Sequence, residues 1–395
     1  MTASSTFWIS SAEAADRLGV KRQSLYAYVS RGQLVSHRRP GLPGTWFDLA
    51  DIEEFARRNP PRNAPSKRTF AFKGVSSHVS SIEDGELFYR GEPAVELGRT
   101  HTFDAVARWL LTGDFAHRPC GLSTEVCEDI RAATSRTGDD LLLRLQVAVA
   151  VGGSHDRLRS DLSPSGLARS SARMTAAMLV GLGAPSSDTE AHTARACARV
   201  LAGPGRPDPA EGVVALVDRA LVLLLDHGLA TSTVAARVAA STRADPYAVV
   251  LSGLAALSGP LHGAASSHVH TLIGRVLDGA DLEWAIAQYL EHSAGVFVAF
   301  GSPQYPEGDP RAADLLDGLR AVPEAADALE ALDAVLGVLG ERAKPNIDAA
   351  LAVLCHAGRL RSDAGTALFA LARAAGWVAH AAEEYREHPL RWRGH

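Results

Sequence analysis

A histidine in a turn rich in glycine and proline is the residue whose placement suggests chemistry most directly. His262 lies in the segment Ser258-Gly259-Pro260-Leu261-His262-Gly263, between two runs with helical periodicity. Gly-Pro ends the first helix and Gly263 permits a tight turn, so we expect His262 just before a helix N-terminus. The helix dipole there disfavours the imidazolium, and a neutral ring can donate a hydrogen bond to an enol or enolate oxygen. The alternative is a turn histidine without a chemical role.

Four further polar residues stand where packing alone would not place them: His227, Arg311, Asp348 and Arg373. His227 ends an apolar helical run, and Arg311 follows Asp309-Pro310, an N-cap and first-turn pair. Asp348 opens another predicted helix. Arg373 lies in a small-residue, apolar helix, where a buried guanidinium needs an anionic partner such as a bound carboxylate.

Each of these four residues also has a purely structural interpretation. Asp348 is suited to an N-cap, and Arg311 to a solvated position in a first turn. Arg373 is suited to pairing with a structural carboxylate, and His227 to an interaction with a helix dipole. The residue types alone leave both sets of interpretations open.

The elements that must position these residues are predominantly helical. Ala, Leu, Val and Arg are abundant and aromatic residues make up only 6% of the 395 residues, which favours helices over sheet. Short β-like pieces are predicted around Val75, Ile82 and residues 87–89. Helical runs are predicted over residues 104–112, 123–133, 139–151, 168–182, 188–202, 210–226, 231–241, 246–257, 264–278, 281–292, 310–319, 323–341, 349–356 and 364–386.

The N-terminal part differs in charge from the remainder. Residues 1–68 hold eleven Lys/Arg against six Asp/Glu, a balance of +5, so with a chain total of −5 the remainder carries −10. Helices over residues 11–18 and 21–31, joined by a glycine turn, form a helix-turn-helix pattern, and residues 36–47 are suited to a basic β-wing. This segment resembles the small winged helix-turn-helix domains of MerR and excisionase proteins. Its side chains suited to DNA are Lys21, Arg22, Gln23, Ser24, Tyr26, Arg31, Arg38 and Arg39. The alternative is a docking or dimerisation module.

Cysteine usage and hydropathy limit the compartment. The four cysteines, at positions 120, 127, 197 and 355, form no C-x-x-C pair, so we expect free thiols in a reducing cytoplasm and no metal site. The first eleven residues do not resemble a signal peptide, and the most apolar run, residues 212–225, is short and charged, so no membrane span is predicted.

Taken together, the region from about Gly74 to the C-terminus resembles the citrate synthase family. Six motifs in family order carry the resemblance: Ser80-Ser81-Ile82 with Leu87-Phe88-Tyr89-Arg90-Gly91, Asp226-His227-Gly228-Leu229 with Ser232-Thr233, Gly259-Pro260-Leu261-His262-Gly263, Asp309-Pro310-Arg311-Ala312, Pro345-Asn346-Ile347-Asp348, and the segment from Phe369 to His380. The resemblance implies an all-α, citrate-synthase-like two-domain helical fold preceded by a small winged helix-turn-helix domain. The implied domains are 1–58, a linker at 59–70, a large domain at 71–263 and 356–395, and a small domain at 264–355.

The resemblance also implies roles for individual residues. Asp348 would be the base that takes a proton from an acyl-CoA, and His262 the neutral donor to the resulting enol. His227, Arg311 and Arg373 would bind the carboxylates of a 2-oxo acid such as oxaloacetate. A further arginine, Arg391 or Arg393, would reach the active site of the partner in a homodimer. The acyl-CoA is a co-substrate, and no cofactor is implied.

One departure from the family pattern affects the expected activity. The family has a second catalytic histidine, which polarises the ketone, where this chain has Ser302. Losing such a donor typically lowers the rate about a hundredfold to a thousandfold. Ser302, Gln304, His268 and His270 are the candidate substitutes, although the two histidines are also suited to solvated positions. Basic residues common in this loop, which help to hold CoA, are replaced by Pro303, Pro306 and Glu307.

Three functions follow from the sequence. The first is a condensing enzyme that joins an acyl-CoA to a 2-oxo acid. The second is a catalytically impaired protein that binds a metabolite and regulates DNA through residues 7–58. The third is a structural dimer scaffold. The combination of Asp348 and His262 favours the first, because a sensor of dicarboxylates would need only the arginines. Ser302 and the N-terminal domain favour the second.

Overall fold

The chain forms two compact units, Met1–Ser76 and Ser77–His395. The computed structural model describes residues 8–11, 14–15, 18, 20–38, 45–48, 51–52, 55, 77–116, 120–187, 192–259, 265–293, 297–340 and 343–392. Val75, Arg39, His262 and Arg393 therefore lie outside the described residues. Each unit has a core of its own.

The N-terminal unit combines a short sheet with helical turns. β1 (Trp8–Ser10) pairs antiparallel with β2 (Trp46–Asp48), and His37 forms a bridge to Trp46, so the chain returns to the sheet after α2 (Arg22–Ser30). The prediction of a helix over residues 21–31 is confirmed to within one residue at each end. The strand β1 was not predicted from the sequence.

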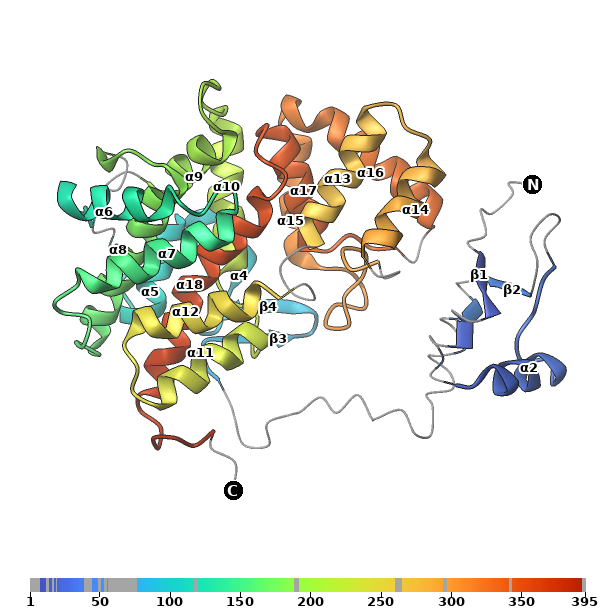
Figure 1. Ribbon diagram of the computed structural model, residues 1–395, viewed down its shortest axis with the longest axis horizontal. Coiled ribbons are helices and arrows are strands. Elements are labelled where there is room, and N and C mark those ends of the chain that lie inside the picture. Colours follow the sequence, from blue (N-terminus) through green and yellow to red (C-terminus); the bar gives the residue numbers. More distant parts are fainter. Residues whose placement is uncertain are drawn as a thin grey trace. The chain divides into compact units, whose positions relative to one another are not determined.

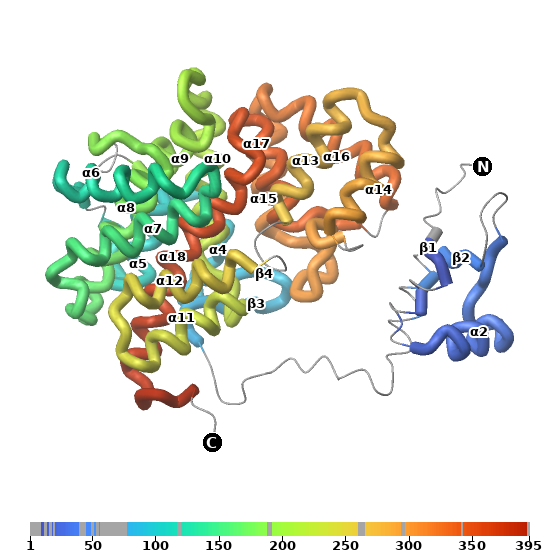
Figure 2. The backbone as a smooth tube through the Cα atoms, in the orientation of Figure 1, coloured from blue at the N-terminus to red at the C-terminus, as the bar shows by residue number. Residues whose placement is uncertain are grey.

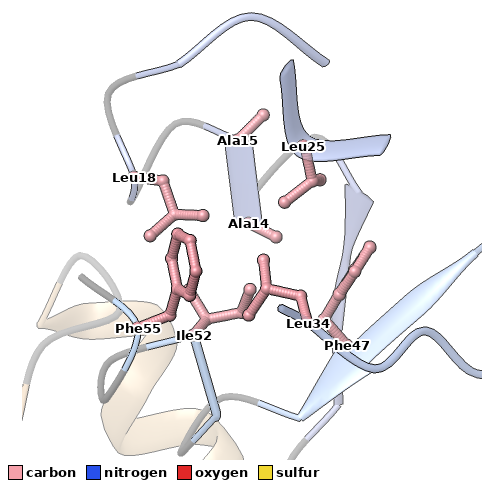
Figure 3. Packing of buried hydrophobic residues seen from close by; sticks show 8 residues of the cluster. All are labelled: Ala14, Ala15, Leu18, Leu25, Leu34, Phe47, Ile52 and Phe55. Carbon is pink, nitrogen blue, oxygen red and sulfur yellow. The ribbon is translucent and has the colours of Figure 1, made fainter. Parts of the chain in front are cut away.

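The core of this unit gathers apolar side chains from several elements. Figure 3 shows that they converge from α2, from β2 and from the helical turns on either side. The buried residues are Ala14, Ala15, Leu18, Leu25, Leu34, Phe47, Ile52 and Phe55. Because Leu25 holds one face of α2 inward, the polar residues of that helix are left outward.

The second unit begins with a small antiparallel sheet and continues almost entirely in helices (Figure 1). The strands are β3 (Ser80–Glu83), β4 (Glu86–Tyr89) and β5 (Glu92–Pro93), in the order β3-β4-β5. The helices are α4 (Ala94–Thr100), α5 (Phe103–Thr112), α6 (Thr124–Thr134), α7 (Leu141–Ser154), α8 (Pro164–Leu182), α9 (Thr193–Ala202), α10 (Glu211–Leu224), α11 (Thr231–Ser241), α12 (Pro246–Leu257), α13 (Ala265–Leu277), α14 (Leu282–His292), α15 (Pro310–Arg320), the 3-10 turn η2 (Pro323–Ala325), α16 (Ala326–Leu339), α17 (Ile347–Ala357) and α18 (Ala364–Glu384).

The long helix α18 runs through the middle of the helical body (Figure 2). It packs against α5, α7, α8, α10, α11 and α12. Small residues allow this close packing: Trp377 is fully buried with its ring against Gly253, and a Cβ at Gly376 would lie 2.0 Å from the Leu225 carbonyl oxygen. The backbone next to His227 is thereby pressed against the helix that carries Arg373.

The helices α13 to α17 gather at one side of this body (Figure 1). α13 packs on α14, α16 and α17, and α17 also contacts α15. α10 touches both α15 and α17, which joins this group to the rest. This grouping resembles the predicted small domain, and the exact boundaries at 264 and 355 stay a prediction.

No helix in the described part of the chain is long and apolar enough to cross a membrane. The four cysteines are free thiols; those at 127, 197 and 355 are buried and Cys120 is partly buried.

Candidate active site

Two neighbouring helix starts bring Arg311 and Asp348 to the same place. Asp309 caps α15 by accepting from the Arg311 backbone N–H at 3.1 Å, as the Asp-Pro pair predicts. The same carboxylate accepts from Nε and Nη2 of Arg311, at 3.0 and 2.7 Å, and from the N–H of Ile347 at 3.1 Å. One buried carboxylate therefore fixes the guanidinium and ties α15 to α17.

The interpretation of Arg311 as a solvated residue is wrong. Only 5% of Arg311 is exposed, because its side chain folds back onto Asp309 and lies over the ring of Tyr305, with Cζ 5.5 Å from the ring centroid. Asp348 is likewise not an N-cap. Asn346 caps α17 by accepting from the Asp348 N–H at 3.0 Å, which leaves the Asp348 carboxylate in the first turn.

The Asp348 carboxylate is held in a form suited to proton abstraction. Burial raises its pKa to about 6; Asp309 adds to this, while the cations Arg311 and Arg373 oppose it. Across the described part of the chain, no side chain forms an ion pair or hydrogen bond with this carboxylate. Its oxygens therefore remain available to accept a proton, while neighbouring charges adjust its pKa.

Arg373 lies on α18 and is 1% exposed. Its Nε donates to the Leu224 carbonyl at 2.8 Å, and its guanidinium lies 4.3 Å from the centre of the Phe369 ring. Among the described residues no carboxylate comes within ion-pair distance, so no structural partner of the kind considered for Arg373 is found there. Burial lowers its pKa from the ordinary value, and an anionic ligand would offset this cost.

His227 lies three residues beyond the end of α10 and near both arginines. Burial, together with the charges of Arg311 and Arg373, lowers the pKa of His227 to about 2, so the ring is neutral at physiological pH. Its Nε2 lies 2.9 Å from the hydroxyl oxygen of Tyr305. His227 therefore belongs to the same cluster as the arginines, and a helix-dipole contact does not describe its surroundings.

A buried polar network supports this cluster from behind. Asp226 is fully buried and accepts from Ser80 and from the Gly228 N–H, and His380 Nε2 lies 3.1 Å from its carboxylate. Although burial opposes it, the His380 ring, Arg373 and Ser80 lower the pKa of Asp226 to about 2. Arg237 can only donate, so the 2.9 Å contact from its Nη1 makes His380 Nδ1 an acceptor and places the ring proton on Nε2, toward Asp226.

Other predicted site residues are placed less directly. Ser302 is half-buried, and its hydroxyl accepts from the Gln304 N–H at 3.3 Å in a local turn. Arg391 donates to both oxygens of Glu384, from Nε at 2.7 Å and from Nη2 at 2.6 Å, so this side chain already has a partner in its own chain. His262 and Arg393 lie outside the described residues, and their roles stay predictions.

The expectation of solvated histidines is wrong for His270. Its ring stacks on that of His356 at a centroid distance of 3.8 Å, and the His270 carbonyl lies 2.9 Å from His356 Nε2. Burial lowers the pKa of His270 to about 4. His268 is also half-buried, and its Nδ1 has no hydrogen-bond partner among the described atoms.

Two residues of the site were missed from the sequence. Tyr305 was not among the substitute donors predicted from the sequence, which were histidine, serine and amide side chains. Lys344 was missed because it is remote in sequence from the loop it serves: its Nζ donates to the Glu307 carbonyl at 2.9 Å. It places a cation beside the segment that lacks the expected basic residues. The segment that holds Lys344 also contacts the loop through Asn346, whose Nδ2 donates to the Val298 carbonyl at 2.9 Å, a contact that no signal in the sequence indicates.

Comparison with known proteins agrees with this arrangement. Residues 71–393 match the family model described as citrate synthase, C-terminal domain, and residues 8–60 match a helix-turn-helix domain. The chain belongs to the citrate synthase family. Its all-α, citrate-synthase-like fold and its N-terminal helix-turn-helix domain confirm the resemblance inferred from the sequence.

Individual relatives show how far the similarity extends. Citrate synthase from Haloferax volcanii is 35% identical over 191 residues, covering 46% of this chain and 50% of the relative. The 2-methylcitrate synthase 2 of Corynebacterium glutamicum is 30% identical over 223 residues, covering 53% and 56%. The chain thus spans about half the length of the curated relatives it matches.

Solved structures show the same fold at lower identity. A ternary complex of citrate synthase from Thermoplasma acidophilum with carboxymethyl coenzyme A and oxaloacetate aligns with a TM-score of 0.63 at 22% identity, covering 80% of this chain and 91% of that one. Citrate synthase from Thermotoga maritima aligns with a TM-score of 0.59 at 24% identity, covering 81% and 92%.

Proposed function

We propose that this citrate synthase family member condenses an acyl-CoA with a 2-oxo acid and releases CoA. The observation that carries the proposal is the Asp348 carboxylate, whose pKa is raised to about 6 and which lies near Arg311 and Arg373 without pairing with either. A thioester α-carbon is a weak acid, so its deprotonation needs a poised base together with a donor to the developing enol. His262 is assigned to that second task.

The two buried arginines supply the binding site for the acceptor. Arg311 is already paired with Asp309 and presents the rest of its guanidinium, whereas Arg373 is a buried cation whose contacts among the described residues are with a carbonyl and an aromatic ring. Planar, permanently charged groups are suited to grip the carboxylates of a 2-oxo acid. The neutral His227 lies near both and adds a polar contact. Ser302 in place of the ketone-polarising histidine makes this an altered site.

The proposal includes a homodimer in which each C-terminal tail completes the partner's site. Because Arg391 is held by Glu384 of its own chain, Arg393 is the remaining candidate for the arginine that crosses between subunits.

The experiment that tests the proposed function is CoA release by the intact protein. Acetyl-CoA and propionyl-CoA are each offered with a panel of 2-oxo acids that includes oxaloacetate, and free thiol is measured. We expect thiol release that depends on both substrates. Absence of release across the panel from a folded protein would overturn the proposal.

A second function, regulation through DNA, is favoured by the surface of α2. Lys21, Arg22, Gln23 and Tyr26 are exposed there. Arg31 and Arg38, further along the chain, are exposed too, and Ser24 is half-buried. Positive and amide side chains on one helix are suited to phosphates and base edges. Binding of duplex DNA that weakens as salt rises is the measurement that tests this function.

A further inference from the structure

Tyr305 occupies the segment in which the family's second histidine is missing. It lies three residues after Ser302, on the loop that leads to α15, and only 2% of it is exposed. Its hydroxyl oxygen is 2.9 Å from His227 Nε2, and the two rings are 5.5 Å apart. Arg311 lies over its face. A phenol from this loop thus reaches the cluster where the acceptor is proposed to bind.

Three other candidate donors of this region, Ser302, Gln304 and His270, are placed less well. Ser302 turns its hydroxyl toward the Gln304 N–H, and Gln304 is exposed. His270 is stacked against His356 on α17. Of the candidates from the loop, Tyr305 is the one with a described contact to His227.

We propose that Tyr305 is the hydrogen-bond donor that polarises the ketone of the acceptor, in place of the histidine absent at position 302. This inference rests on the proposed condensation. His227, protonated on Nε2, donates to the phenol oxygen, which leaves the phenol hydrogen for the ketone oxygen. His227 is then a positioning residue for Tyr305, while the arginines hold the carboxylates.

The step balances with groups already assigned. Asp348 takes the α-proton of the acyl-CoA, and the enolate carbon that results forms a bond to the ketone carbon while the thioester carbonyl re-forms. The carbonyl π electrons become an alkoxide, which takes the phenol proton of Tyr305. The tyrosinate, held by the His227 N–H and the charge of Arg311, regains a proton from Asp348 through solvent. The α-proton is thereby transferred to the new hydroxyl group. Water then hydrolyses the thioester of this condensation product: its oxygen forms the new carboxyl group, the C–S bond breaks and CoA leaves as the free thiol.

The protonation states agree with this role. Burial and the Asp309 carboxylate raise the pKa of Tyr305 to about 12 although Arg311 opposes them, so the phenol keeps its proton at neutral pH. His227 is neutral over the same range and is able to donate from Nε2.

The test separates enolisation from condensation in the intact protein. Tyr305→Phe should lower kcat for thiol release about a hundredfold to a thousandfold, the usual effect of losing such a donor. Deuterium exchange from solvent into the acyl α-carbon, measured with a 2-hydroxy analogue of the acceptor, should persist at the parental rate because Asp348 is untouched. Ser302→His added to Tyr305→Phe should restore part of the condensation. Tyr247→Phe is the matched control, since that phenol is also buried and donates to Asp156 at 2.9 Å, away from the site.

The outcomes separate the proposed role of Tyr305 from the proposed condensation on which it rests. A parent protein that shows neither exchange nor thiol release refutes the proposed condensation itself. A parent that is active, with Tyr305→Phe equally active in condensation, overturns the role of Tyr305 alone. Equal loss of exchange and condensation in a folded Tyr305→Phe protein also overturns it, because the residue would then act on the site as a whole.

Discussion

At the scale of single residues, the site contains ionisable groups whose charged forms are destabilised by burial. Asp348 is a carboxylate whose pKa is raised by burial, and Arg373 is a buried cation whose pKa burial lowers. Both would be more stable in water than where they stand, in the absence of a ligand. Such placement is expected where binding energy is used for chemistry and is unexpected in a scaffold.

The raised pKa of Asp348 has a consequence for stability. A carboxyl group whose pKa is higher in the folded state favours folding while it is protonated, and that contribution is lost as pH rises through about 6. Asp348→Asn removes the charge, so we expect its gain in free energy of unfolding over the parent to be larger at pH 8 than at pH 5, and to vanish below the ordinary pKa of 3.8. Urea unfolding at the two pH values measures this. Asp333→Asn, at an exposed position on α16, is the control and should show no pH-dependent gain; a destabilised Asp348→Asn protein at pH 8 would contradict the assignment.

The residue types of the site were predictable, and their contacts were not. Asp348, Arg311, Arg373 and His227 stand out in sequence because each is polar where its neighbours are apolar. The ion pair between Arg311 and Asp309 was not predicted. The sequence indicates Asp309 as an N-cap, but the same carboxylate also binds the Arg311 side chain. Tyr305 gave no signal, since an isolated tyrosine in a loop resembles any other.

At the scale of elements, the positions of the site residues depend on close helix contacts. α18 passes so near the end of α10 that only a glycine fits at position 376. This contact sets Arg373 against the Leu224 carbonyl and the backbone that leads to His227. The packing of small residues along α18 is therefore part of the architecture of the site.

Substituting alanine at Gly376 and, as a matched control, at Gly337 tests how tight this helix contact is. Gly376→Ala would place a methyl group 2.0 Å from a backbone oxygen, and we expect it to destabilise the protein by about 1–3 kcal/mol through overpacking. Gly337 is exposed on α16, and a Cβ at this position would meet nothing within 4 Å, so Gly337→Ala should stabilise by about 0.5–1 kcal/mol. Chemical unfolding measures both. Equal effects of the two substitutions would show that the α10–α18 contact is not tight.

Periodicity predicted most of the helices, and the misses have physical reasons. α11 and α12 were predicted with the bounds that the structure has, since Asp245-Pro246 marks the start of α12. α4 was missed because it is only seven residues long and contains Gly98, which packs against Arg219. β1 was missed because three residues carry no periodic pattern, and its partner β2 is more than thirty residues away.

At the scale of the whole molecule, the chain joins a basic unit to an acidic one. The balance of +5 over residues 1–68 contrasts with −10 over the remainder. The exposed cations of α2 belong to the first unit, and Asp348, Arg311 and Arg373 to the second. Substitutions in one unit should therefore leave the other unit's activity unchanged.

Neutralising α2 tests this separation. We expect Lys21→Ala with Arg22→Ala to weaken binding to duplex DNA and to reduce the slope of log affinity against log salt by about 2, because each cation would neutralise one phosphate. Thiol release should be the same as in the parent. Fluorescence anisotropy with a labelled duplex at several salt concentrations measures the change. Glu92→Ala, exposed in the second unit, is the control; unchanged affinity in the double variant would exclude α2 as the contact surface.

The central claim is that Asp348 is the base that removes a proton from the acyl-CoA. The most direct measurement is kcat/KM for thiol release between pH 5 and pH 8, in the parent and in Asp348→Asn. Because the carboxylate is the active form and burial raises its pKa to about 6, kcat/KM should rise with pH around that value in the parent and be abolished in the variant. Parental turnover in Asp348→Asn would contradict the claim.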